Sequence, residues 1–209
     1  MSDEIVPLLH HPSVATRLVP VDLILSCGDL LPSYIEYLVT LLQAPCYYVR
    51  GNHDSRGERR ENGTRLMHPR GCENLDLRSV YVGGLLLAGV EGSIRYNREG
   101  VQYSEMEMAR RLWRLVPRLL WNKYRYGRYL DILITHAPPR GIHDGPGAHR
   151  GFEALRRFIE RFEPRYLIHG HVHLRYGYGD QSPVQVGRTT VINTCGYTIL
   201  EIDPDQLAA

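Results

Sequence analysis

Short runs of apolar residues, many of them β-branched or aromatic, recur along the chain and end in glycine or polar residues. This pattern is typical of buried strands that lead into tight turns. The runs at 80–82 and 85–90 are expected to form a hairpin around Gly83 and Gly84. The last two runs look like closing antiparallel strands. In order, the runs cover residues 21–27, 46–49, 80–82, 85–90, 130–135, 165–168, 191–193 and 199–202.

Between the strands, apolar residues recur at helical spacing in three segments. Ser33 with Glu36, and Ser104 with Glu107, have the spacing of a capping box, so each serine is expected to begin a helix. Pro117 is expected to kink the second of these helices. The third helix has an apolar face formed by Phe152, Leu155, Ile159 and Phe162.

Alternating strands and helices predict an α/β fold, in which ligands bind at the carboxyl ends of the strands. Residues 55–78 are rich in arginine and turn-forming residues and are predicted to be a long loop. The chain has 209 residues, 43% of them hydrophobic, and shows neither repeats nor a linker. These properties predict that residues 1–209 form a single domain.

Charge and cysteine usage exclude several classes of protein. The net charge of +2 gives no strong bias toward nucleic acid or membrane surfaces. The four cysteines have no Cys-x-x-Cys spacing, no signal peptide is visible, and the longest apolar stretch, 80–90, is too short to cross a bilayer. We therefore expect a reducing, cytoplasmic environment and no association with membranes.

Four of the predicted strands end in residues that can bind a metal ion. In order along the chain these are Asp29, then Asn52 with His53, then His136, and finally His171 with His173. Carboxylate and amide oxygens together with imidazoles suit Mn²⁺, Fe or Zn²⁺, and the absence of cysteine ligands argues against a structural zinc site. A carboxylate such as that of Asp29 has enough lone pairs to bridge two cations.

The same segments resemble the motifs of the calcineurin-like metallophosphoesterase superfamily. The matching motifs are Gly28-Asp29, Gly51-Asn52-His53-Asp54, His136 and Gly170-His171-Val172-His173, in the family's order. The resemblance implies a four-layer α/β/β/α sandwich of two mixed sheets flanked by helices. It also implies a centre of two divalent cations, with Mn²⁺ or Fe as the expected metals and Zn²⁺ as the alternative.

Carried over residue by residue, the resemblance assigns roles to these side chains. Asp29 would bridge both cations at the catalytic centre, and His173 would hold the first cation. His53 would protonate the leaving oxygen of the substrate without binding metal. The second cation would be held, besides Asp29, by Asn52, His136 and His171.

The chain departs from the family at the first motif, Asp-x-His. Asp3 matches the aspartate that binds the first cation, but Ile5 replaces the histidine. The first site is therefore expected to bind its cation weakly or to stay empty. Met1 and Ser2 are too short to supply the central strand that the family has before this motif. This observation motivates the hypothesis that the native start lies upstream, which translation of the preceding genomic sequence would test.

The predicted function is the metal-dependent hydrolysis of a phosphomonoester or phosphodiester, with a metal-bound hydroxide as the nucleophile. Two alternatives remain: a catalytically weak or inactive scaffold of the same fold, and a nuclease. Nucleic acid is an unfavoured partner, and a small-molecule phosphate ester is the expected substrate. The loops at 55–78 and 140–151 are expected to set specificity, and Arg95 and Tyr96 are secondary candidates for contacting a phosphate.

Overall fold

The strands form two main sheets in the computed structural model, which describes residues 1–18, 20–97, 99–173 and 182–203. The smaller sheet is parallel, with β1 (Ile24–Ser26), β2 (Cys46–Tyr48) and β5 (Cys72–Asn74) in that order. The larger sheet has the order β12–β13–β11–β10–β7–β6. It contains β6 (Ser79–Val82), β7 (Leu85–Val90), β10 (Ile132–Thr135), β11 (Tyr166–His169), β12 (Val184–Val186) and β13 (Thr189–Asn193).

The larger sheet is mixed, as the family resemblance predicts. Its four inner strands run parallel, and its edge strands β6 and β12 are antiparallel to their neighbours. The described strands of the smaller sheet are all parallel, which differs from the expectation of two mixed sheets. The hairpin predicted around Gly83 and Gly84 is confirmed by the pairing of β6 with β7.

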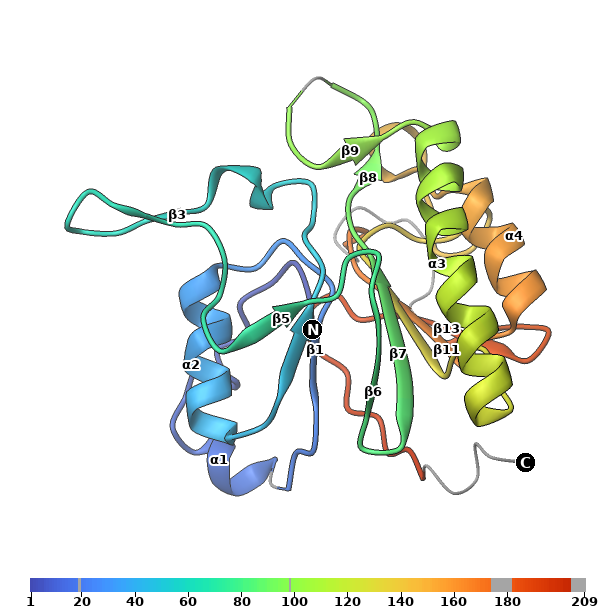
Figure 1. The fold of residues 1–209 in the computed structure, drawn as a ribbon. Helices are drawn as coiled ribbons and strands as arrows, with labels where there is room; N and C mark the ends of the chain where they lie inside the picture. The colour runs from blue at the N-terminus through green and yellow to red at the C-terminus, as the bar shows by residue number, and fades with distance from the viewer. Residues whose placement is uncertain (19, 98, 174–181, 204–209) are drawn as a thin grey trace.

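Helices cover the outer faces of both sheets (Figure 1). The helices α1 (Val14–Arg17) and α2 (Pro32–Leu42) lie on the smaller sheet, and α3 (Glu105–Tyr126) and α4 (Glu153–Phe162) lie on the larger one. Successive side chains of a strand point to opposite faces, so β10 divides its residues between two cores. Ile132 and Ile134 pack between the sheets, whereas Leu133 packs against α3 and α4.

The two predicted capping boxes have different outcomes. Ser104 and Glu107 form the box that begins α3, and this helix continues past Pro117 to Tyr126. At α2 the prediction is wrong, because the helix begins at Pro32 and no side chain caps it. Ser33 instead bonds Glu58 through its backbone N–H and its hydroxyl, at 2.9 and 2.7 Å. The carboxylate of Glu36 binds Arg70, so tertiary contacts take both partners of the expected box.

The prediction of a long loop at 55–78 is also wrong in part. This stretch contains a 3₁₀ turn, η1 (Asp54–Arg56), and a short hairpin of β3 (Glu58–Arg59) and β4 (Arg65–Leu66) that projects from the body of the molecule (Figure 1). It then adds β5 to the smaller sheet. Two further elements lie near the carboxyl ends of the strands: the ribbon of β8 (Ser93–Ile94) and β9 (Gln102–Tyr103), and the 3₁₀ turn η2 (Gly147–His149).

The closing strands differ from the prediction as well. Residues 199–202 form no strand, and β13 pairs in parallel with β11 and in antiparallel with β12. Leu200 and Ile202 nevertheless pack against the core between the sheets. The apolar side chains of Leu200 and Ile202 therefore indicate packing against the core rather than strand pairing.

The first residues lie between β1 and the segment after β13. The terminal amine of Met1 donates to the carbonyl of Leu25, and the N–H of Cys27 donates to the carbonyl of Met1. Ser2 and Gly196 exchange two backbone hydrogen bonds of 3.2 and 2.9 Å. These bonds fix the position of the residue that follows, Asp3. In the described part of the chain, no helix is both long enough and apolar enough to cross a bilayer.

Candidate metal centre

Each main sheet contributes two strand ends to one polar cluster. Asp29 follows β1 and Asn52 follows β2, while His136 follows β10 and His171 follows β11. Carboxyl ends of parallel strands meet at one edge of a sheet, and the two sheets pack face to face. The strand-end pattern of the sequence therefore becomes a single site shared by both sheets.

The side chains of Asp29, Asn52 and His136 are in direct contact. The Nε2 atom of His136 lies 2.9 Å from Oδ1 of Asn52 and 3.2 Å from Oδ2 of Asp29. His136 is fully buried and Asn52 is buried. Nδ1 of His136 donates to the carbonyl oxygen of Cys27 at 2.7 Å, so Nε2 is the nitrogen that points toward the two oxygens.

This arrangement fits a cation. A carboxylate oxygen, an amide oxygen and the second imidazole nitrogen converge in a buried place, and positive charge must lie between them. Burial is the largest single influence on His136 and alone would lower its pKa, but the charge and hydrogen bond of Asp29, with the charge of Asp3 and the bond to Cys27, together raise it to about 10. Burial alone would raise the pKa of Asp29, yet His136 and the N–H of His53 lower it to about 2. A divalent cation can take the place of the shared proton.

His171 completes this cluster. One ligand atom each from Asp29, His136 and His171 lies within 4.8 Å of the other two. The Nε2–H of His171 donates to the carbonyl of Ala148 at 2.8 Å, so Nδ1 carries the lone pair. Burial, together with the neighbouring His136, lowers the pKa of His171 to about 3. The ring is therefore neutral, as a metal ligand must be.

The backbone at these positions is strained. Asp3, Asp29 and His171 have positive φ angles of 62°, 55° and 69°, a region that costs a residue with a side chain about 1–3 kcal/mol. Gly51 makes the close approach of the loops possible, because a Cβ atom there would lie 2.0 Å from Oδ1 of Asp29. Such strain persists where the surroundings hold it, often at functional sites.

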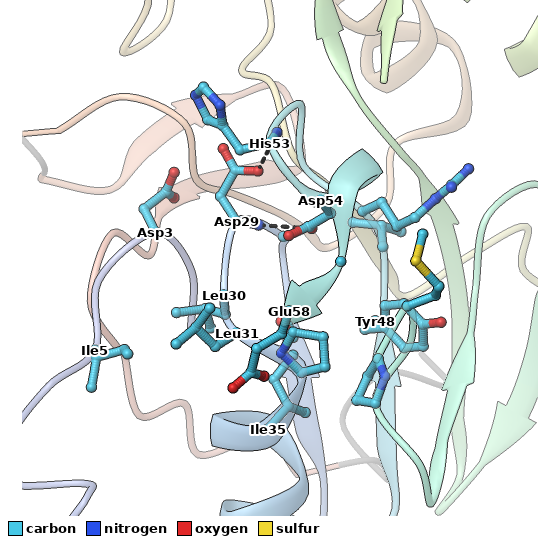
Figure 2. Close-up of a pocket in the computed structure, with 18 of the residues that line it drawn as sticks. Asp3, Ile5, Asp29, Leu30, Leu31, Ile35, Tyr48, His53, Asp54 and Glu58 are labelled. Carbon is cyan, nitrogen blue, oxygen red and sulfur yellow. Dashed lines mark hydrogen bonds between the residues drawn. The ribbon is translucent and has the colours of Figure 1, made fainter. Parts of the chain in front are cut away.

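Two residues of the motif after β2 support Asp29 without joining the cluster. The backbone N–H of His53 donates to Oδ1 of Asp29 at 2.8 Å, and its ring is exposed above that carboxylate (Figure 2). Oδ2 of Asp54 accepts from the N–H of Gly51 at 2.7 Å and from the N–H of Asp29 at 3.0 Å. Asp54 thus ties together the loops that follow β1 and β2.

The residues expected at the first cation site are less closely grouped. Oδ2 of Asp3 accepts from the N–H of His171 at 2.8 Å, and Oδ1 lies 3.7 Å from Nε2 of His173. Asp3 is close to Asp29, since its N–H donates to the carbonyl of Gly28. Their carboxylates point to the same side in Figure 2. Ile5, in the place of the family's histidine, offers no ligand and lies lower in the same view.

A cavity of about 390 Å³ opens beside these carboxylates. Asp3, Asp29, His53 and His173 contribute to its wall. Beyond these polar groups, the cavity extends between α2 and the segment that contains β3 and β4, and its lining there is largely apolar (Figure 2). The apolar lining includes Ile5, Leu30, Leu31, Ile35, Met67 and Pro69.

Sequence reasoning missed the contacts of several residues near the site. Tyr96 is a sequence candidate for phosphate contact, but its hydroxyl accepts a 3.0 Å hydrogen bond from Nδ2 of Asn52. Arg95, the other such candidate, pairs with Glu107 at 2.7 Å. Glu4 and Cys195 lie beside His173. Cys195 follows β13, so it shares the strand-end position of the other candidate residues.

A mixed α/β fold with carboxylate, amide and imidazole groups meeting at its strand ends is the arrangement expected of a metal-dependent phosphoesterase. The family model for calcineurin-like phosphoesterases matches residues 5–175, so the chain belongs to this family. The match begins after Asp3, at the position where the first motif departs from the family. Members of this family use divalent metal ions, and Asp29, His136 and His171 form a group that could hold one.

Individual proteins with similar sequences include UPF0046 protein K07C11.7 of Caenorhabditis elegans, 30% identical over 158 residues, which are 69% of this chain and 49% of that protein. Human metallophosphoesterase domain-containing protein 1 is 26% identical over 168 residues, 78% of this chain and 46% of that protein. The chain thus spans about half the length of these curated relatives. The crystal structure of TT1561 of Thermus thermophilus has the same fold, with a TM-score of 0.58 at 19% identity, over 93% of this chain and 87% of that one.

Proposed function

We propose that this protein hydrolyses a phosphate ester at a cation bound by Asp29, Asn52, His136 and His171. The observation that carries the proposal is the convergence of Oδ2 of Asp29 and Oδ1 of Asn52 on Nε2 of His136, within 3.2 Å. Membership of the calcineurin-like phosphoesterase family supports the same reaction class.

A bound divalent cation would supply Lewis acidity, which lowers the pKa of a water molecule and neutralises charge on the phosphoryl oxygens. Mn²⁺, Fe and Zn²⁺ all suit a set of one carboxylate, one amide oxygen and two imidazoles. Asp3, Asp29 and His173 would provide the first position of a dinuclear centre. We expect that position to be the weaker one, because Ile5 supplies no ligand.

We assign the role of general acid to His53. Its backbone N–H is fixed by the carboxylate of Asp29, while its ring is exposed at the wall of the cavity. From there the imidazole can deliver a proton to the oxygen that leaves phosphorus. Imidazole is the side chain that most often carries out such proton transfers near neutral pH.

The cavity favours a small phosphate ester whose alcohol carries an apolar or aromatic group. The phosphate would lie next to Asp29 and His53, and the apolar lining would receive the organic part. This arrangement is compatible with a monoester and with a diester. Two features favour the alternative function, a metal-binding scaffold without activity. Ile5 offers no ligand, and Nε2 of His173 lies 3.7 Å from Oδ1 of Asp3.

The experiment is a hydrolysis assay with p-nitrophenyl phosphate and bis-p-nitrophenyl phosphate in the presence of Mn²⁺, combined with metal analysis of the same samples. His53→Ala should lower turnover by about 10²–10⁴-fold and retain its metal content. Asp29→Ala should lose both its turnover and its bound metal. His11→Ala, which removes an exposed histidine from the segment before α1, is the control and should behave like the wild type.

Three results would contradict parts of the proposal in different ways. Unchanged turnover in His53→Ala would remove His53 from the role of general acid. Wild-type protein that binds Mn²⁺ and hydrolyses neither ester would favour the scaffold. Binding of oligonucleotides that weakens steeply with salt would revive the nuclease.

A further inference from the structure

A second group of metal-ligating side chains lies on the far edge of the His173 ring. The Nδ1 atom of His173 is 3.5 Å from Oε1 of Glu4 and 3.6 Å from Sγ of Cys195. One ligand atom from each of the three residues lies within 4.8 Å of the others. The other ring nitrogen, Nε2, faces Asp3 on the side of the phosphoesterase site. We refer to Glu4, His173 and Cys195 as the outer triad.

The backbone holds the outer triad together from three segments of the chain. Ser2 exchanges two hydrogen bonds with Gly196, which places Glu4 near Cys195. Oδ1 of Asn193 accepts from the N–H of Cys195 at 3.1 Å. Nδ2 of the same asparagine donates to the carbonyl of Val172 at 2.8 Å. One buried side chain, Asn193, therefore links the residue before His173 to Cys195.

The chemistry of the outer triad matches Zn²⁺. A thiolate, an imidazole and a carboxylate are the three ligand types that Zn²⁺ takes in proteins, and a fourth position would remain for water or substrate. The thiolate disfavours Mn²⁺ and Mg²⁺, which prefer oxygen ligands. The side chains of Glu4 and His173 are 36% and 27% exposed, so an ion can reach them from solvent.

We propose that Glu4, Nδ1 of His173 and Cys195 bind a Zn²⁺ ion outside the Asp29 cluster. A neutral imidazole has one lone pair, so His173 can serve the Asp3 side or the outer triad, but not both. A zinc ion in the outer triad therefore takes His173 away from the first position of the phosphoesterase centre. That position already lacks a histidine at Ile5. The inference goes beyond the proposed function and does not depend on turnover.

The test uses Co²⁺ as a spectroscopic substitute for Zn²⁺ in the full chain. A cobalt–thiolate bond gives a charge-transfer band in the near ultraviolet, and oxygen and nitrogen ligands do not. We expect the band in the wild type and in Asp29→Ala, and its loss in Cys195→Ser. Cys72→Ser removes another partly exposed thiol, on β5, and should keep the band.

Zinc affinity, measured by competition with a chelating dye, gives a second readout. Cys195→Ser and Glu4→Gln should each weaken the binding of one Zn²⁺ equivalent by at least about tenfold, since disturbing even the partners of metal ligands costs about 10–100-fold. Zn²⁺ should also slow alkylation of Cys195 by iodoacetamide while leaving Cys72 unaffected. Circular dichroism spectra matching the wild type would show that the variants are folded.

A cobalt–thiolate band that persists in Cys195→Ser would overturn the proposal. So would wild-type zinc affinity in a folded Cys195→Ser variant, or equal alkylation of Cys195 with and without Zn²⁺. Failure of these tests leaves the Asp29 cluster untouched, because none of its ligands is changed by Cys195→Ser or Glu4→Gln. A failure of the proposed hydrolysis would, in turn, leave the cobalt and zinc results standing.

Discussion

The hydroxyl of Tyr96 orients the amide of Asn52, and removing it should weaken cation binding. Nδ2 of Asn52 donates to Oη of Tyr96 at 3.0 Å, which turns Oδ1 of the same amide toward His136. In Tyr96→Phe this bond is lost, and the amide can rotate so that its NH₂ group faces the cation. Such an orientation repels a metal ion, because NH₂ is a hydrogen-bond donor without a lone pair to offer.

The size of the effect follows from the geometry. A neutral hydrogen bond contributes about 1 kcal/mol net, which corresponds to about a fivefold change in Kd. Mutation of residues that orient metal ligands costs as much as about 10–100-fold. Tyr96 is 42% exposed, so losing its oxygen opens no core cavity. We therefore expect Tyr96→Phe to bind Mn²⁺ at least about fivefold more weakly than the wild type, with little change in the stability of the fold.

Isothermal titration of chelator-treated protein with Mn²⁺ measures this change directly. Tyr81→Phe is the matched control, since Tyr81 is 53% exposed and lies on β6, stacked against Tyr126 at 4.6 Å. The control should keep the wild-type Kd. An unchanged Kd in Tyr96→Phe would refute the argument that Tyr96 sets the orientation of Asn52.

Three further predictions concern the same centre. Ile5→His, which restores the family's histidine beside Asp3, should strengthen binding of a second Mn²⁺ equivalent; unchanged stoichiometry and affinity in the titration would contradict this. Asp54→Ala leaves the N–H groups of Gly51 and Asp29 without their acceptor, so it should lower the free energy of unfolding in urea by about 2 kcal/mol or more; a loss below about 0.5 kcal/mol would speak against it. In metal-free protein the pKa of His136 is raised to about 10, so protonated His136 stabilises the fold. This stabilisation is complete below pH 6.5, the ordinary pKa of histidine, and is lost as the pH rises toward 10. The pKa of Asp29 is lowered to about 2, so ionised Asp29 also stabilises the fold. This stabilisation is complete above pH 3.8, the ordinary pKa of aspartate, and is lost as the pH falls toward 2. The melting temperature should therefore fall from about pH 6.5 toward 10 and from about pH 4 toward 2, and saturating Mn²⁺ should suppress the alkaline fall; a profile identical to that of His136→Gln would refute the assignment.

The convergence of the strand-end residues was predictable because strand polarity does most of the positioning. A buried apolar run followed by Gly-Asp or Gly-Asn-His leaves little choice of where the polar side chain can lie once the strands are parallel. For this reason Asp29, Asn52, His136 and His171 meet as the sequence indicates. The mutual placement of Asp3 and His173 depends on loops that cross between the sheets, and no spacing rule determines it.

The errors have physical causes that local patterns do not contain. The capping box at Ser33 fails because Glu58 and Arg70, distant in sequence, compete for its two side chains. The segment 199–202 has the apolar composition of a short strand, but β12 already pairs with the edge of β13 that an antiparallel partner would need. Cys195 has no second cysteine nearby in the sequence, and its partners Glu4 and His173 reach it only through tertiary structure.

The most direct test of the account is a crystal structure of the protein soaked with Mn²⁺, recorded with anomalous scattering from the metal. We predict a peak coordinated jointly by Asp29, Asn52, His136 and His171. A fully occupied peak located elsewhere, or no peak in a crystal whose protein binds Mn²⁺ in solution, would contradict the assignment of the catalytic cation to this cluster.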